Sequence, residues 1–202
     1  SSVGEILGVI PLIEKLENKK DIKQILITSN TLSSSKIISN LNLKKVVHQF
    51  FPIDTNFLSK NFIKFWKPDL AIFIESEFWP NMILEIKKKK IPLILLNARF
   101  TKKSFNRWKS VKYFSKLIIS KFDLCLAQND ETKKYLQKLG AHKVKKPGNL
   151  KFCDSISSIS VNRYKKVISK KFLNSKKILF CAVSTHYDEE IFCGKIHKDS
   201  KN

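Results

Sequence analysis

The sequence predicts an α/β protein built on a doubly wound parallel sheet. Short apolar segments alternate with helix-length segments along most of the chain, and polar or charged residues follow the apolar segments. The run 70–74, Leu-Ala-Ile-Phe-Ile, has no polar interruption, which is typical of a parallel strand covered on both faces.

Each element of this sheet follows from apolar spacing and turn residues. A first helix is expected to start near Glu5, and Gly140 is expected to end the last helix of the series. The predicted strands are 22–28, 45–51, 70–74, 92–96, 122–127 and 143–146. The other predicted helices are 57–66, 79–89, 104–120 and 130–139, with one more between the first two strands.

A serine-rich link at 155–160 follows this alternation, and a basic helix at 161–172 and a strand at 177–183 come after it. We therefore expect a first domain at 1–154, a linker with a connecting helix at 155–175, and the truncated start of a second domain at 176–202.

The net charge of +22, from 39 basic and 17 acidic residues, predicts anionic partners such as phosphorylated lipid, an anionic membrane or a phosphate-bearing donor. Only Arg99, Arg107 and Arg163 are arginines, which argues against a dedicated nucleic-acid reader. No run of 18 or more apolar residues is present, so a membrane anchor, if the protein has one, is expected before Ser1.

The four cysteines lie far apart and have no histidine at zinc-site spacing, so neither a zinc site nor a disulfide framework is indicated. A reducing cytoplasm is the expected compartment. These residues are Cys125, Cys153, Cys181 and Cys193.

Polar clusters follow four of the predicted strands, and ligands of an open parallel sheet bind beyond the carboxyl ends of its strands. Site residues are therefore expected at this edge. The clusters are Glu75-Ser76-Glu77-Phe78-Trp79-Pro80, Asn97-Ala98-Arg99, Pro147-Gly148-Asn149-Leu150-Lys151-Phe152 and Ser184-Thr185-His186.

The carboxylates of these clusters have structural explanations that compete with a functional role. Glu5 fits a capping box with Ser2, and Glu77 fits the start of a helix. Glu75 directly ends an apolar strand, where a carboxylate needs a partner; Arg99 is the candidate.

The remaining candidates also keep two interpretations each. Trp79 is more typical of a core residue than of a ligand platform. Arg99 suits an ion pair or an anion clamp equally well, whereas Lys151 is one of many lysines and is best explained as solvated. The turn at 184–186 suits phosphate binding or simply the N-cap of a helix with three acidic residues in its first turn.

Aromatic and basic residues are mixed in the predicted helix 104–120. This mixture suits a surface that meets an anionic amphiphile, although packing of the aromatic residues on the sheet is the favoured interpretation. The aromatic and apolar members are Phe105, Trp108, Tyr113, Phe114 and Leu117.

Six motifs, taken together and in order, resemble the bacterial 3-deoxy-D-manno-octulosonic acid (Kdo) transferases of lipopolysaccharide synthesis. The likeness covers essentially all of this chain but about the first half of a family member. The motifs are Ser2-Val3-Gly4-Glu5, Glu75-Ser76-Glu77-Phe78-Trp79-Pro80, Asn97-Ala98-Arg99, Leu126-Ala127-Gln128, Gly148-Asn149-Leu150-Lys151-Phe152 and Ser184-Thr185-His186.

The resemblance implies two Rossmann-like domains in the GT-B arrangement, with 1–154 as the acceptor-side domain. It implies transfer of Kdo from CMP-Kdo to a lipid A precursor, with inversion and without metal or other cofactor, at the cytoplasmic face of the bacterial inner membrane. Glu5 then matches the general base. The implied acceptor-binding or supporting residues are Gly4, Glu75, Glu77, Trp79 and Arg99, and the implied donor-binding residues are Asn149, Lys151, Ser184, Thr185 and His186.

The sequence departs from the family pattern at three places. The turn 28–35 is less threonine-rich, Cys153 follows Phe152 where an aspartate is common, and the tail 193–198 is expected to end where a helix should continue. We expect no turnover from this chain alone. Two alternatives remain open: another GT-B glycosyltransferase that uses a nucleotide sugar, and a non-catalytic basic module that binds nucleic acid or another anionic polymer.

Overall fold

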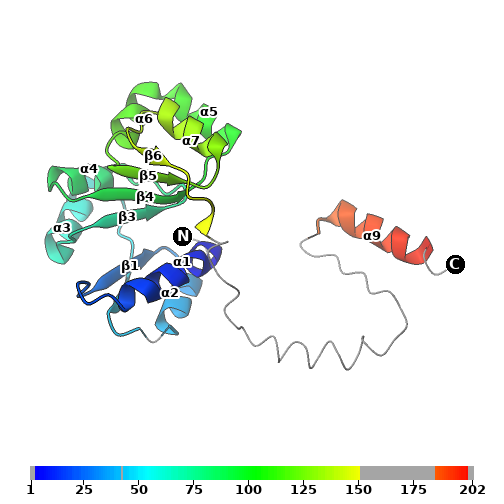
Figure 1. Ribbon diagram of the computed structural model, residues 1–202, viewed down its shortest axis with the longest axis horizontal. Coiled ribbons are helices and arrows are strands. Elements are labelled where there is room, and N and C mark those ends of the chain that lie inside the picture. The colour runs from blue at the N-terminus through cyan, green and yellow to red at the C-terminus, as the bar shows by residue number, and fades with distance from the viewer. Residues whose placement is uncertain (1–2, 42, 151–184, 200–202) are drawn as a thin grey trace. The chain divides into compact units, whose positions relative to one another are not determined.

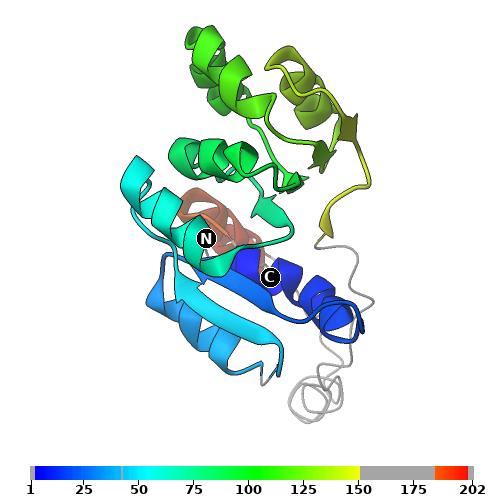
Figure 2. The same cartoon turned by 90° about the vertical axis from the view of Figure 1, so that its left-hand side faces the viewer.

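A computed structural model describes residues 3–41, 43–150 and 185–199 (Figures 1 and 2). The chain divides into two compact units, Ser1–Ser155 and Ile156–Asn202. The serine-rich link 155–160, the helix 161–172 and the strand 177–183 that the sequence predicts lie outside the described residues. The division into three segments at 154 and 175 stays a prediction.

All strands in the described part of the first unit run parallel, which confirms the α/β class and the parallel sheet. They form two hydrogen-bonded sheets (Figure 1). One sheet has two strands, β1 (Ile25–Ser29) and β2 (Val46–Phe50). The other has the order β3-β4-β5-β6, made of Ala71–Ile74, Leu93–Ala98, Leu124–Ala127 and Val144–Lys145.

Helices connect the strands, and their first residues follow capping side chains. The hydroxyl groups of Thr31, Thr55 and Thr101 each accept a backbone N–H three residues later. Gly140, at φ +105°, follows α7 and confirms the predicted helix end. The helices are α1 (Val3–Glu17), α2 (Leu32–Ser39), α3 (Asn56–Trp66), α4 (Pro80–Lys88), α5 (Lys102–Ser110), α6 (Lys112–Ile119), α7 (Asp130–Lys138) and, in the second unit, α9 (Tyr187–Asp199).

The region 104–120, predicted as one helix, is two helices separated at Val111. The backbone of Val111 has φ −108° and ψ 48°, which is outside the helical region. The buried hydroxyl group of Ser115 donates to the carbonyl oxygens of Trp108 and Val111 across this break. The prediction of a continuous helix was wrong because apolar periodicity continues through Val111 while the backbone turns there.

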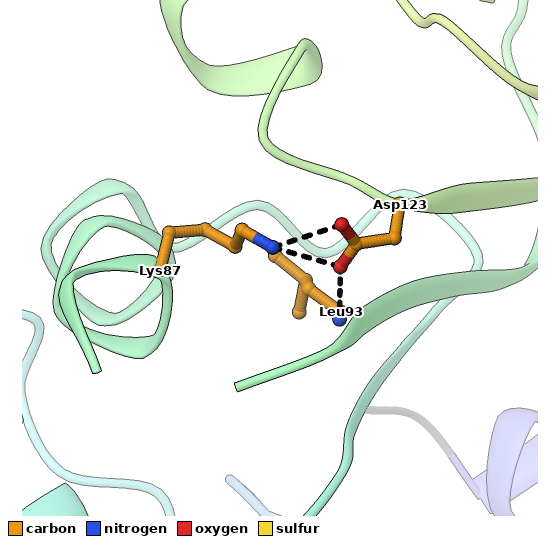
Figure 3. Close-up of polar contacts among 3 residues, drawn as sticks. All are labelled: Lys87, Leu93 and Asp123. Carbon is orange, nitrogen blue, oxygen red and sulfur yellow. Dashed lines mark hydrogen bonds and ion pairs between the residues drawn. The ribbon is translucent and has the colours of Figure 1, made fainter. Parts of the chain in front are cut away.

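The main hydrophobic core lies under the four-stranded sheet. Leu93 and Leu95 of β4 and Ile118 of α6 are completely buried, and the core residues all fall between Ile63 and Ala141. At the amino end of the sheet, the carboxylate of Asp123 accepts the backbone N–H of Leu93 at 2.7 Å and the ammonium group of Lys87 at 2.8 Å (Figure 3). This contact ties α4, β4 and β5 together.

Helix α1 packs through one face, and its last residue fixes the segment that leads into β2. Ile6, Val9 and Ile13 are buried at helical spacing, and α1 contacts α2. The carboxylate of Glu17, at the end of α1, accepts the backbone N–H groups of Lys44 and Lys45 just before β2. Within the described ranges, no helix has the length and apolar character needed to cross a bilayer.

Candidate active site

A cleft of about 450 Å³ lies where the chain leaves the carboxyl ends of β3 and β4. It brings together residues that are far apart in the sequence, since Glu5 comes from the first turn of α1 and the others follow the two strands. Its lining residues are Glu5, Glu75, Ser76, Glu77, Arg99, Thr101 and Ser104. Four of them, Glu5, Glu75, Glu77 and Arg99, are among the site residues that the sequence predicts.

Glu75 is the first residue after β3 and has a left-handed backbone with φ +57°. This conformation is uncommon for a residue with a Cβ atom and is found more often at functional sites than elsewhere. Its N–H donates to the carbonyl oxygen of Leu96 at 2.9 Å, which extends the parallel ladder by one bond. Ser76 then donates its hydroxyl group to the carbonyl oxygen of Arg99, so the segments after β3 and β4 are joined. The ion pair between Glu75 and Arg99 stays a prediction.

The indole N–H of Trp79 holds Glu77 by donating to its carboxylate oxygen Oε2 at 2.9 Å. The Trp79 ring packs on the hydrophobic core, with its centroid 5.0 Å from that of Phe51. The Trp79 ring is therefore a packing residue, and its nitrogen orients a carboxylate that lines the cleft. Its role as a ligand platform stays a prediction.

Asp54, a residue that the sequence interpretation missed, accepts the free backbone N–H groups at the start of α4. Its carboxylate accepts the backbone N–H of Asn81 at 3.0 Å and that of Met82 at 2.8 Å. Asp54 lies between β2 and α3, so no signal near α4 in the sequence identifies it. Glu77 is not needed as the helix cap, because Asp54 already fills this role.

Asn97 connects three of the motifs that the sequence shows as separate. It lies at the end of β4 with φ +53° and is 4% exposed. Its side-chain oxygen accepts the backbone N–H of Leu150 at 2.9 Å, and its carbonyl oxygen accepts the amide N–H of Gln128 at 2.9 Å. The turn that contains Asn149 is therefore fixed to the carboxyl edge of the sheet.

The cationic side of the cleft continues into the start of α5. Arg99 is exposed, and Thr101 caps α5 by accepting the backbone N–H of Ser104 at 3.1 Å. Thr101 and Ser104 are lining residues that the sequence interpretation missed, whereas Ser76 belongs to a predicted cluster but had no role assigned. The Thr-x-x-Ser spacing at 101–104, a few residues after a predicted strand, was the available signal for Thr101 and Ser104.

The other predicted residues lie at different places. Gly4 is exposed in the first turn of α1, where an added Cβ atom would meet nothing within 4 Å. Thr185 and His186 belong to the second unit and precede α9, where the backbone N–H of His186 donates to Glu189 at 2.9 Å. This contact and the acidic first turn of α9 agree with the N-cap interpretation. Lys151 and Ser184 lie outside the described residues, as does Ser2 of the predicted capping box.

Two further predictions concern metals and cysteines. Among the described residues, no three His, Cys, Asp or Glu side chains are grouped closely enough to hold a metal ion. Cys125 is completely buried in β5, and burial raises the pKa of its thiol to about 12. A thiol with this pKa is protonated at neutral pH and packs as a small apolar side chain.

Parallel sheets with a cleft at their carboxyl ends define the first unit as an α/β protein of the Rossmann-like class. Residues 1–154 match a family described as 3-deoxy-D-manno-octulosonic-acid transferase. The chain is also similar to the 3-deoxy-D-manno-octulosonic acid transferases of Rickettsia bellii (36% identity, 95% of this chain, 45% of the relative), Rickettsia prowazekii (36%, 95%, 41%) and Haemophilus influenzae (30%, 98%, 46%).

The chain therefore belongs to the Kdo transferase family, as the sequence motifs predict. It spans less than half the length of these three relatives. Members of the family are glycosyltransferases, and residues 1–154 correspond to their N-terminal domain.

Proposed function

We propose that the complete enzyme transfers Kdo from CMP-Kdo to a lipid A precursor, and that residues 1–154 form its acceptor-side domain in a GT-B arrangement. The observation that carries this proposal is the cleft that joins Glu5 to Glu75 and Glu77 after β3 and to Arg99 after β4. Membership of the Kdo transferase family supports the choice of sugar.

Glu5 acts as the general base in the proposed reaction. Its carboxylate accepts the proton of an acceptor sugar hydroxyl while the oxygen of that hydroxyl forms a bond to the anomeric carbon of Kdo. The bond between this carbon and the phosphate oxygen of CMP breaks in the same step, and its electron pair leaves with CMP. Attack from the side opposite the leaving group inverts the anomeric configuration. The proposal needs no metal or other cofactor.

Glu75 and Glu77 hold the acceptor in this proposal. Carboxylate oxygens accept hydrogen bonds from sugar hydroxyl groups, and the indole of Trp79 limits the orientations that Glu77 can take. Three carboxylates in one cleft disfavour an anionic group beside them, so the phosphates of the acceptor are expected on the side of Arg99. Arg99 binds such an oxyanion through paired N–H groups, and Thr101 and Ser104 add hydroxyl donors.

The donor is proposed to contact two segments. Asn149 lies on the turn fixed by Asn97 at the carboxyl edge, and Lys151 follows it in the sequence. The second segment is 184–186. Lysine and a turn rich in donors suit the phosphate and carboxylate groups of CMP-Kdo. The enzyme is proposed to work at the cytoplasmic face of the bacterial inner membrane, where the charge of +22 on this 202-residue chain favours anionic lipid.

Replacing Glu5 with glutamine in the complete enzyme tests the general base. Glutamine keeps the size of the side chain and can still form hydrogen bonds, but it does not accept a proton at neutral pH. We expect kcat to fall by roughly 10²- to 10⁴-fold with little change in KM, because the acceptor still binds. The measurement is transfer of labelled Kdo from CMP-Kdo to a lipid A precursor.

Glu14→Gln is the matched control, because Glu14 lies exposed on the same helix and does not line the cleft. Its turnover should equal that of the unchanged enzyme. Near-normal turnover of Glu5→Gln with unchanged thermal stability would remove Glu5 as the base. Transfer from another nucleotide sugar, with none from CMP-Kdo, would instead contradict the proposed donor.

A further inference from the structure

Strand β4 contains one extra residue opposite β5, just before its carboxyl end. Leu95 is opposite Cys125, and the next paired residues are Ala98 and Ala127, so two residues of β4 stand opposite one residue of β5. The second of these two, Asn97, has φ +53° and is 4% exposed. An extra residue of this kind is a β-bulge. Bulges are over-represented next to active sites, because they redirect the side chains of a strand.

Asparagine suits the position of the bulge for two reasons. It adopts a left-handed backbone more readily than most residues with a Cβ atom. Its side-chain oxygen also accepts the backbone N–H of Leu150, while its carbonyl oxygen accepts from the side-chain amide of Gln128. Asn97 therefore joins the segments that follow β4, β5 and β6, which are neighbours in the sheet (Figure 1).

The chain after the bulge is fixed on both sides of Arg99. Ala98 is completely buried, and the N–H of the buried Phe100 donates to the hydroxyl oxygen of Thr132 at 3.1 Å. Arg99 lies between them, is exposed and lines the cleft. Side chains of a strand alternate between its two faces, so one residue more or less would turn Arg99 to the other side. The bulge therefore determines the direction in which Arg99 leaves the sheet.

The turn 147–150 is the segment that the side chain of Asn97 holds. Strand β6 before this turn has only two residues, and Gly148 has φ +105° with nothing within 4 Å of the place where a Cβ atom would be. A turn with little packing depends more on its hydrogen bonds to keep one conformation. The bond from the N–H of Leu150 to Asn97, at 2.9 Å, therefore limits where Asn149 can lie.

We propose that Asn97 is a positioning residue of the transferase, which keeps the turn 147–150 at a fixed place relative to Arg99 and the cleft. The backbone of the bulge directs Arg99 toward the acceptor, and the side chain of Asn97 holds Asn149 for the donor. One buried residue thus sets the spacing between the groups that bind the two substrates. Asn97 acts through these neighbours and not by contact with a substrate.

This inference deepens the proposed function and rests on it for one point, the contact of Asn149 with the sugar donor. Asn97→Gly in the complete enzyme tests it, because glycine adopts φ +53° without strain and keeps the carbonyl oxygen that accepts from Gln128. Only the bond to Leu150 is lost. We expect the KM for the donor to rise about three- to tenfold, because fewer molecules have the turn ready to bind. The KM for the acceptor and kcat at saturating donor should stay nearly unchanged.

Two further variants separate positioning from a merely structural role. Asn97→Asp keeps an acceptor oxygen for Leu150 and tolerates a left-handed backbone, so its KM for the donor should return toward that of the unchanged enzyme. Asn97→Ala lacks the oxygen and strains the backbone, so it should raise the KM for the acceptor as well, because Arg99 then shifts. A merely structural role would lower thermal stability and leave both KM values constant.

The contact between Asn97 and the turn can also be measured without any substrate. In the 202-residue chain, the N–H of Leu150 should exchange with deuterium about three- to tenfold faster in Asn97→Gly, and Asn97→Asp should restore its protection. This rate, followed by NMR, does not depend on the donor. If the unchanged enzyme transferred nothing from CMP-Kdo, the proposed donor would be wrong, and the kinetic comparison would use the nucleotide sugar that the enzyme accepts.

Asn129→Gly is the matched control. The side-chain oxygen of Asn129 also accepts a backbone N–H, that of Thr132 at 2.8 Å, but Asn129 is exposed and does not line the cleft. This variant should change neither KM nor the exchange of Leu150. Two results would overturn the role of Asn97: equal protection of the Leu150 N–H in Asn97→Gly and the unchanged chain, or an equal KM for the donor in the two enzymes.

Discussion

The two parallel sheets of the first unit differ in how much core each one carries. In the four-stranded sheet, Leu93 and Leu95 are completely removed from solvent, and α4 and α6 supply further buried residues. In the two-stranded sheet, Ile25, Leu26 and Ile27 of β1 are only half-buried, and neither strand contributes to the main core. The cleft draws residues from both regions, because Glu5 lies on α1 and the others follow β3 and β4.

The cleft residues of the two regions are therefore held in different ways. The residues after β3 and β4 are anchored to a close-packed core, which fixes their positions. Helix α1, which carries Glu5, contacts α2, and the carboxylate of Glu17 at its end accepts backbone N–H groups just before β2. Glu5 is therefore positioned by α1 and not by the strand ends that hold the other cleft residues.

The largest expected effect tests the core directly. Leu95→Ala should lower the free energy of unfolding by about 2–5 kcal/mol, because a completely buried side chain leaves a cavity. Ile27→Ala in β1 should cost about 1 kcal/mol, since that side chain already contacts solvent. Urea unfolding followed by circular dichroism measures both. An equal loss of unfolding free energy in the two variants would contradict this expectation, because it would mean that the two sheets share one core.

The second test concerns Asp123, which fixes the amino end of the larger sheet (Figure 3). Asp123→Ala should cost about 1–3 kcal/mol, because it leaves the N–H of buried Leu93 without its acceptor. Asp123→Asn retains one acceptor oxygen and should cost less. Thermal unfolding of the two variants measures the difference, and equal stability of Asp123→Ala and the unchanged chain would contradict this role.

The ionisation of Asp123 should also make the stability of the fold depend on pH. Burial raises its pKa, but hydrogen bonds from Lys87 and from the N–H of Leu93, with the charge of Lys87, outweigh burial and hold the pKa below its ordinary 3.8. The folded state therefore favours the carboxylate. This stability is fully present above pH 3.8 and is lost as the pH falls through the folded pKa. Asp123→Asn should lack this acid-dependent loss.

The smallest expected effect concerns His48 in the two-stranded sheet. Its Nε2 lies 2.8 Å from the hydroxyl oxygen of Ser29 and its Nδ1 lies 3.3 Å from that of Ser35, so neutral imidazole links β2 to β1 and α2. Burial lowers the pKa of His48 from 6.5, because it disfavours the charged ring. The resulting stability is present above pH 6.5 and is lost as the pH falls through the folded pKa.

His48→Gln separates this effect from other titrations, because glutamine can still donate and accept between the two serines but does not titrate. The difference in melting temperature between the unchanged chain and His48→Gln should shift in favour of the variant as the pH falls below 6.5. A difference that is constant with pH would show that His48 does not respond to protonation in this sheet.

Sequence patterns predicted much of the fold because they depend on local physics. Uninterrupted apolar runs identified β3 and β4, and Gly140 identified the end of α7. The break at Val111 was missed, because apolar periodicity is the same in one helix as in two consecutive helices. The favoured prediction that the aromatic residues of this region pack in the core holds for Phe105, which is buried, but not for Tyr113, which is exposed.

The candidate site was predictable where a residue directly follows a strand. Glu75, Glu77 and Arg99 were found in this way, because the carboxyl ends of parallel strands meet at one edge. Asp54 and Asn97 could be assigned their roles only from the structure. Asp54 caps a helix 27 residues further along the chain, and Asn97 binds Leu150 53 residues away. Such contacts leave no local pattern.

The sequence by itself therefore determined the α/β class, the family and the residues that border the sheet edge, since these follow from periodicity, composition and short motifs. Only the tertiary structure decided that Glu5 shares a cleft with the segments after β3 and β4, and that the larger sheet holds most of the core. It also decided which apolar side chains of α3 and α6 stay exposed. The physical reason is that burial and long-range hydrogen bonds depend on how distant segments pack, which periodicity along the chain does not specify.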